Sequence, residues 1–336
     1  MNKIAIYILM VLVFLVASIG FSPKTLEFEQ QLKELALRIF FCGLFLGLLF
    51  FYKYIHRFFF YGVGPKMSQK FYPSVNSADT VHYFSRILGF SIVFSSVQIY
   101  LLGGVVITIA PLFFRSLIIF LIYFVSLSIS ESIAFYQFTY EDEISKRKNL
   151  CYGVIHLCQS IALAFVIKRV IIVSDFFLPL GESFGWLFFL WLYASVIFGL
   201  AIKLFSSYSK LPFNKLVMEK NMALGISYSG YILGCALLVN SSLLKKTTDI
   251  TMYLQTVGLK TLLIILILPL FIIGVKKVFL FRDHSGISGE YEFDLQRPEI
   301  GYGLYEGAIF LASSLMTTVI VDQIFFGNIS PFLSFP

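Results

Sequence analysis

The feature that most constrains this chain is a series of apolar segments, each about 20 residues long, that recurs along its whole length. A helix of that length can cross the hydrocarbon core of a bilayer, which is about 30 Å thick. Of the 336 residues, 58% are hydrophobic and 13% are charged, whereas soluble domains carry about 25% charged residues. The segments are 4–21, 37–58, 84–106, 115–137, 150–173, 184–205, 222–243, 258–281 and 302–325. The sequence therefore predicts an all-α polytopic transmembrane helix bundle with about nine spans.

The first segment allows two interpretations. Lys3 precedes an apolar run, and Ala17–Gly20 supplies the small residues of a signal-peptide cleavage site. The run is longer than the roughly 7–15 apolar residues of a signal-peptide core, so we favour a retained transmembrane helix. Residues 1–36 are thus expected to form an N-terminal helix, as an anchor or a signal peptide, and an external loop.

The other eight segments alternate between two types. B helices, predicted at 37–58, 115–137, 184–205 and 258–281, are rich in Leu, Ile and Phe. A helices, predicted at 84–106, 150–173, 222–243 and 302–325, contain more Gly, Ala and Ser. A polar connection leads from each B helix to the next A helix, and most A-to-B turns are shorter.

The A helices can be aligned on one position in their first turn, which holds Thr80, Gly153, Gly225 and Gly303 at spacings of 73, 72 and 78 residues. Four positions earlier lie Asn76, Asn149, Asn221 and Glu299, whose side chains can accept hydrogen bonds from the free amides of a helix start. Nine positions later lie Gly89, Ala162, Gly234 and Ala312, all small. A fixed period of this kind predicts tandem repeats. We expect four two-helix repeats at 37–106, 115–173, 184–243 and 258–325, followed by an external tail at 326–336.

Lys and Arg are more numerous in the B-to-A connections than on the other side of the predicted membrane. The positive-inside rule therefore predicts that the B-to-A connections are cytoplasmic and that the C-terminus lies outside. Because each repeat contains two helices, all four enter the membrane in the same orientation. They are then related by an axis along the membrane normal, unlike the inverted repeats of many transporters.

The Lys203–Leu244 stretch carries a family resemblance. Its elements are Tyr208-Ser209-Lys210, Pro212, Asn221, Met222-Ala223-Leu224-Gly225, Gly230, Gly234 and Asn240-Ser241-Ser242. This stretch resembles the bacterial membrane proteins of the domain of unknown function 350 family, which look like tandem two-helix units. The resemblance extends more weakly to 143–165 and 294–315. It implies a multi-pass protein of the bacterial inner membrane and implies no catalytic residue or substrate.

Polar side chains recur three positions after the aligned residue, at Tyr83, His156, Tyr228 and Glu306, with Arg86 and Gln159 three positions further on. Residues three apart share a helix face, so aligned repeats would place these groups at a common depth. They could form a packed cluster that fixes how repeats dock, with Arg86 paired to Glu306. They could instead line a polar vestibule or ion pathway with Glu306 as its key acid. We favour the packed cluster, because a buried ion pair can be mainly structural.

Glu131 is a further acid near the end of a B helix. It could line the same vestibule, but we expect its side chain to extend to the membrane interface.

Glycines spaced by four residues form small helix faces at Gly43 and Gly47, at Gly230 and Gly234, and at Gly303 and Gly307, and Gly225 is a further candidate for helix packing. Such faces let helix backbones approach closely in lipid. We favour packing within one chain over a seam between subunits.

The sequence contains none of the common motifs of soluble enzymes, and its four histidines and four cysteines predict no metal site, cofactor or disulfide. The net charge of +7 is spread over loops between spans, so nucleic-acid binding is not predicted, whereas anionic lipid headgroups would be attracted by about 1 kcal/mol per cation. The mixed-charge connection 282–299 could be a docking surface or a linker. We expect a non-enzymatic scaffold or subunit of a membrane complex, as a homo-oligomer or with another partner. The alternative is an ion or small-solute channel or transporter, and a membrane enzyme ranks third.

Overall fold

The computed structural model describes residues 26–59, 75–97, 99, 105–174, 180–208, 211–244, 250–278, 299–322 and 324. The regular elements in these ranges are helices: α2 (Leu26–Phe59), α3 (Ser77–Phe94), α4 (Val105–Ala134), the π-helix η2 (Glu141–Lys146), α5 (Leu150–Val173), α6 (Leu180–Tyr208), α7 (Phe213–Met218), α8 (Met222–Ser242), α9 (Ile250–Val278) and α11 (Ile300–Asp322). The predicted helix 4–21, the tail 326–336 and residues 282–298 lie outside the described ranges.

Seven described helical segments are long and apolar enough to cross a membrane, which makes the chain a multi-span membrane protein. They are Gln30–Tyr52, Ile107–Ala134, Leu150–Val173, Phe184–Phe205, Met222–Ser242, Thr251–Val278 and Ile300–Asp322. Each overlaps a predicted segment.

The predicted span at 84–106 is wrong in its bounds. Helix α3 already begins at Ser77 and ends at Phe94, and α4 begins at Val105. The Ser95 and Ser96 hydroxyls donate to the carbonyls of Ile92 and Val93, and such local hydrogen bonds compete with continuation of the helix. Residues 107–114, which separate the predicted spans 84–106 and 115–137, belong to α4.

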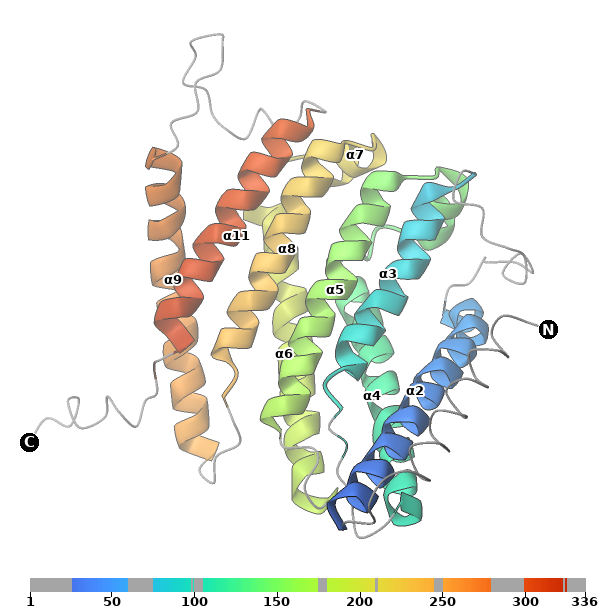
Figure 1. Ribbon diagram of the computed structural model, residues 1–336. Coiled ribbons are helices and arrows are strands. Elements are labelled where there is room, and N and C mark those ends of the chain that lie inside the picture. Colours follow the sequence, from blue (N-terminus) through green and yellow to red (C-terminus); the bar gives the residue numbers. More distant parts are fainter. Residues whose placement is uncertain are drawn as a thin grey trace, which may run out of the picture. The chain divides into compact units, whose positions relative to one another are not determined.

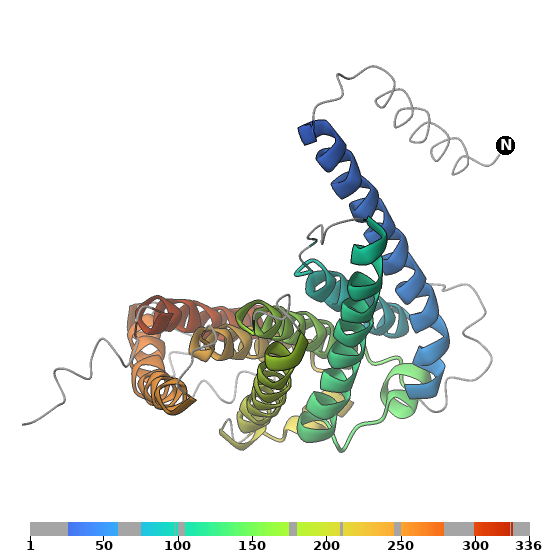
Figure 2. The same cartoon turned by 90° about the horizontal axis from the view of Figure 1, so that it is seen from below.

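The chain divides into two compact units, one within Met1–Leu48 and Gln98–Leu117 and the other within Leu49–Val97 and Ile118–Pro336. The second unit holds the four A helices, which are α3, α5, α8 and α11, and each packs against the next in that order. Helix α6 packs against α5 and α8, and α9 packs against α8 and α11 (Figure 1). Seen from below, α6 lies on one side of the row formed by α5, α8 and α11 (Figure 2). The A helices thus form one layer of this unit.

Asparagine side chains begin three of the A helices, as predicted. The Oδ1 atoms of Asn76, Asn149 and Asn221 accept hydrogen bonds from backbone amides three residues further on. The Nδ2 atoms of Asn76 and Asn149 also donate, to the carbonyls of Ile144 and Val217 at 2.9 and 2.7 Å. Both carbonyls belong to the connection before the next A helix and lie 68 residues further along the chain. One side chain therefore starts its own helix and fixes the approach to the next.

The first-turn glycines lie where neighbouring A helices come closest. A Cβ atom at Gly153 would lie 3.2 Å from the Ala78 carbonyl oxygen, and one at Gly225 would lie 2.8 Å from Cys151 Sγ. A Cβ atom at Gly303 would overlap the backbone of Ala223. In each case the contact lies two positions before the aligned residue of the preceding A helix. Consecutive A helices therefore meet through the same contact three times.

The remaining predicted glycine faces differ from one another. A Cβ atom at Gly230 would lie 2.5 Å from Gly307 Cα, and one at Gly234 would lie 2.7 Å from Ser314 Oγ, so both pack against α11. At Gly43 and Gly47 no described atom lies within 4 Å of such a Cβ. The close packing predicted at Gly43 and Gly47 is therefore not found among the described residues.

Candidate functional site

A group of interacting buried polar and charged side chains lies between α3, α4 and α5. Arg86 on α3 is 1% exposed and forms an ion pair with Glu131 on α4. Its guanidinium also donates to Ser160 Oγ at 3.0 Å and to His82 Nε2 at 3.2 Å. A charge this deep in an apolar environment is tolerated only with such compensation. The cluster thus joins three helices through one arginine.

His156 on α5 approaches the same carboxylate. Its Nδ1 lies 3.4 Å from Glu131 Oε1, and its side chain is 2% exposed. The imidazole is surrounded by rings, with centroid distances of 4.3 Å to Tyr152 and 5.2 Å to both His82 and Phe135. Packing therefore fixes the ring beside the carboxylate.

Gln159 and Tyr83 occupy the border of this cluster. Gln159 Nε2 donates to Ser130 Oγ at 2.9 Å, one residue before Glu131. Tyr83 stacks on Tyr52 with a centroid distance of 5.6 Å, and Tyr52 stacks in turn on Phe124 of α4. The side chains of Gln159 and Tyr83 thus help to hold α4 against α5 and α3.

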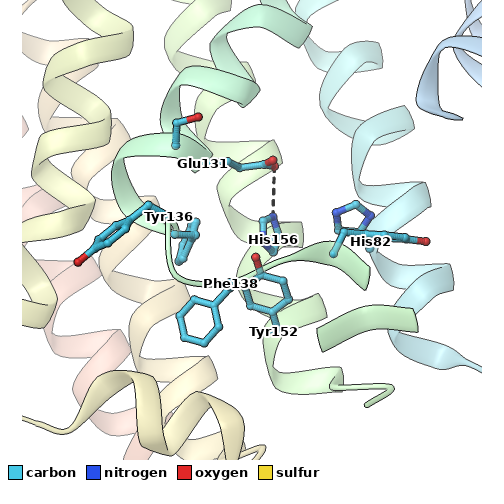
Figure 3. A pocket seen from close by; sticks show the side chains of 9 residues that line it. His82, Glu131, Tyr136, Phe138, Tyr152 and His156 are labelled. Atoms are coloured by element: carbon cyan, nitrogen blue, oxygen red, sulfur yellow. Dashed lines mark ion pairs between the residues drawn. The ribbon is translucent and has the colours of Figure 1, made fainter. Parts of the chain in front are cut away.

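A cavity of about 250 Å³ adjoins the cluster on the side of the connection from α4 to α5 (Figure 3). Glu131, His82, His156, Tyr136, Phe138 and Tyr152 line it, and the other lining residues are Ser132, Phe135 and Tyr140. Tyr140 closes one side, because its hydroxyl donates to Asp79. Burial and this carboxylate raise the pKa of Tyr140, so the hydroxyl stays protonated.

The structure places Glu306 elsewhere. The pair Arg86–Glu306 does not form, since Glu306 on α11 binds Lys276 on α9 at 3.0 Å and Arg86 binds Glu131. Tyr228 lies between these two sites along the row, and its hydroxyl donates to the Ile202 carbonyl at 2.9 Å. The structure does not bring Tyr83, His156, Tyr228 and Glu306 together, because each contacts a group on a neighbouring B helix instead.

The Glu131–His156 contact and the Lys276–Glu306 ion pair occupy corresponding places with the acid and the base exchanged. In one, the acid Glu131 is on the B helix and the base His156 is on the following A helix. In the other, the base Lys276 is on the B helix and the acid Glu306 is on the following A helix. An A helix therefore pairs with the B helix before it at both positions.

Sequence reasoning gave Glu131 the wrong surroundings. Its side chain is 20% exposed and is held by Arg86 instead of extending to the interface. The available clue was its isolation, since a lone acid in the apolar run 105–134 requires a partner. The nearest lone cation in an A helix is Arg86. Ser160 and Lys276 were missed because each contact joins separate elements. His82 lies four residues before Arg86 on the same helix, and that spacing was the available signal.

Comparison with known proteins identifies a family for the C-terminal part of the chain. Residues 179–321 match the model of the Domain of Unknown Function (DUF350). The match includes the Lys203–Leu244 stretch and the Lys276–Glu306 pair, whereas Arg86, Glu131 and His156 precede it. No curated protein and no solved structure matches the chain. The protein is thus a multi-span membrane protein whose residues 179–321 are a DUF350 domain.

Proposed function

We propose that the protein is a non-enzymatic subunit of a membrane assembly, and that two copies join through α11. The observation that carries the proposal is the outward face of this last A helix. Gly301, Ala308 and Ala312 are exposed along one stripe of α11. They correspond by the repeat spacing to Ala223, Gly230 and Gly234 of α8, which α11 covers. Helix α11 therefore presents on its exposed face the same pattern of small residues that it covers on α8.

The earlier A helices support the same interpretation. Ala78 and Gly89 on α3 meet α5, and Cys151 on α5 meets Gly225 of α8. Each of these small seams is covered by the next A helix. Small faces of this kind drive helix association in lipid, where apolar side chains gain little from meeting one another. The exposed small face of α11 has the same character as the faces through which consecutive A helices pack three times within the chain.

A two-fold arrangement fits this face best. The receiving position of α5, α8 and α11 is Gly153, Gly225 or Gly303, but α3 carries Thr80 there. Head-to-tail stacking of α3 on α11 of another copy would therefore lack the glycine that permits close approach. A two-fold axis along the membrane normal instead brings two α11 seams together in parallel, and such an isologous contact closes at two subunits.

Disulfide cross-linking tests this assembly. Among the described cysteines only Cys42 is exposed, so Cys42→Ser provides the background. Ala308→Cys should give a covalent dimer upon oxidation in membranes. Ile273→Cys on α9 is the matched control, because it is exposed and lies close to the depth set by the Lys276–Glu306 pair. Equal cross-linking at both positions, or a monomer in mild detergent for the wild type, would contradict the proposal.

The proposal includes the four-repeat architecture and its orientation. We infer four parallel two-helix repeats in a bacterial inner membrane, with B-to-A connections in the cytoplasm and the C-terminus outside. The recurring Asn and Gly contacts between consecutive A helices support the repeats. The concentration of Lys and Arg in the B-to-A connections supports the orientation.

A channel or transporter is the second candidate, favoured by the cavity beside Glu131 and His156. Against it, Arg86, His156 and Glu306 do not line one passage, because Glu306 is held by Lys276 on a different pair of helices. Flux of small cations into proteoliposomes separates the two candidates. Wild-type flux that Glu131→Gln abolishes and Glu306→Gln leaves unchanged would favour transport, and absence of flux would favour the structural subunit.

A further inference from the structure

We propose that the cavity between α3, α4 and α5 is a binding site for a small organic ammonium ion. The cavity is built largely from buried groups: His156 is 2% exposed and His82 is 1% exposed. Nε2 of His156 has no hydrogen-bond partner among the described residues, and its ring points into the cavity (Figure 3). A buried imidazole nitrogen without a partner is costly, so a ligand that satisfies it would be stabilised there.

The charges of the cavity wall favour a cation. Among the residues that the structure describes, Glu131 is the only acid that lines the cavity, and no Lys or Arg lines it. Its counter-ion Arg86 is buried and does not line the cavity; the guanidinium contacts Glu131, Ser160 and the lining residue His82. A ligand in the cavity therefore contacts the carboxylate and not the guanidinium.

The hydrogen-bonding capacity of the wall also favours a donor-rich ligand. The hydroxyl of Ser132 already donates to the Ser128 carbonyl at 2.7 Å, and that of Tyr140 donates to Asp79. The groups that remain include the Glu131 carboxylate and Nε2 of His156. Nδ1 of His156 faces that carboxylate at 3.4 Å and so carries the ring proton, which leaves the Nε2 lone pair as an acceptor. An ammonium group supplies N–H donors to such acceptors, whereas an anion would find two of the wall's hydroxyl donors already engaged.

Aromatic rings form most of the remaining wall. Phe138 and Tyr152 lie with their centroids 5.4 Å apart, and Phe135 lies 5.2 Å from His156. Ring faces attract organic cations, and an aromatic cage with one carboxylate is a recurring solution for binding alkylated ammonium groups. Among the described residues no three His, Cys, Asp or Glu side chains are placed to hold a metal ion. A volume of about 250 Å³ also suits a small organic cation better than a bare ion.

The inference is independent of the α11 assembly, since all lining residues belong to α3, α4, α5 and the connection between α4 and α5. Calorimetry on the full-length protein in detergent provides the test, with ethylammonium chloride as the probe and sodium acetate as the anionic comparison at equal ionic strength. We expect saturable binding of ethylammonium and none of acetate. Absence of ethylammonium binding, or saturable acetate binding, would overturn the proposal.

Two variants locate the site. Phe138→Leu removes one ring of the wall without touching the ion pair and should weaken ethylammonium binding about 5-fold. Phe165→Leu, an exposed position further along α5 and away from the cavity, is the matched control and should leave binding unchanged. Glu131→Gln should abolish binding if the variant folds; if it does not fold, the comparison of Phe138→Leu with Phe165→Leu decides. Equal affinities of those two variants would contradict the assignment.

Discussion

At the scale of single residues, Arg86 shows what a charge within an apolar helix bundle requires. Its guanidinium contacts a carboxylate, a hydroxyl and an imidazole from three helices. Removing one partner of such a pair costs more than the pair contributes, because the remaining charge is left buried without compensation. Glu131 is therefore expected to matter more for stability than any other acid of the described spans.

We predict that Glu131→Gln lowers the free energy of unfolding by about 3–5 kcal/mol. Glu306→Gln should cost about 1 kcal/mol, since the Lys276–Glu306 pair is more exposed. Unfolding in mixed micelles followed by circular dichroism measures both. The double variant Arg86→Met with Glu131→Gln should recover part of the loss. A Glu306→Gln variant that is the less stable of the two would contradict this ranking.

The sequence allowed the polar positions to be predicted but not their partners. Tyr83, His156, Tyr228 and Glu306 contact groups on B helices, whereas their common face suggested a cluster among the A helices. Their pairing depends on which helix stands next to each one, and that is a property of the packed unit. Alignment within A helices led to Arg86–Glu306, whereas the contacts run between A and B helices.

At the scale of helices, the recurring glycine contact is the main packing device of the second unit. A larger side chain at Gly225 would meet Cys151 of the neighbouring helix. The Cβ atom would lie 2.8 Å from Cys151 Sγ, with the Cys151 carbonyl oxygen and Cα at 3.5 and 3.6 Å. The further atoms of a leucine side chain would have no room beside this backbone, so α5 and α8 would have to separate.

Gly225→Leu should therefore destabilise the protein strongly, with the loss of helix packing visible as a lower thermal midpoint in detergent. Gly43→Leu is the matched control, because no described atom lies within 4 Å of its Cβ position. The control should retain the wild-type midpoint. Similar midpoints for both variants would show that the close approach of α5 and α8 is not needed.

The asparagine caps lead to a second prediction at this scale. Asn149 Oδ1 accepts from the Tyr152 amide, and its Nδ2 donates to Glu143 and to the Val217 carbonyl. Asn149→Ala should lower the free energy of unfolding by about 1 kcal/mol for the lost cap alone. The loss should be larger still, because the Glu143 carboxylate and the Val217 carbonyl would each lose a hydrogen-bond donor. Asn149→Asp keeps the cap acceptor but faces Glu143, so it should not restore stability. Chemical unfolding of the two variants tests this order.

Helix starts were more predictable than helix ends. Asn76, Asn149 and Asn221 mark starts because their side chains act on amides within the same turn. The end of α3 at Phe94 depends on serine hydroxyls that bind nearby carbonyls in an otherwise apolar stretch. Hydropathy alone extended the predicted helix to residue 106, because hydropathy detects the length of an apolar stretch and not the local hydrogen bonds that end a helix.

At the scale of the whole molecule, the proposed orientation can be tested with cysteines in a Cys42→Ser background. Lys146 and Lys215 lie in B-to-A connections and are exposed, whereas Ser95 lies after an A helix and is also exposed. A membrane-impermeant maleimide added to intact cells should label Ser95→Cys only. Lys146→Cys and Lys215→Cys should react after permeabilisation. Labelling of only one of Lys146→Cys and Lys215→Cys in intact cells would contradict parallel repeats.

The contact of Gly153, Gly225 and Gly303 with the preceding helix bears on how such a chain could change its length during evolution. Each junction requires a first-turn glycine on one A helix and a small residue on the A helix before it. A hairpin gained by gene duplication beyond α11 would therefore meet a surface suited to it. Loss of the last hairpin would likewise expose α8, whose surface resembles the one that α11 now presents. Membrane proteins with this junction can therefore differ in their number of hairpins without having to evolve a new kind of helix contact.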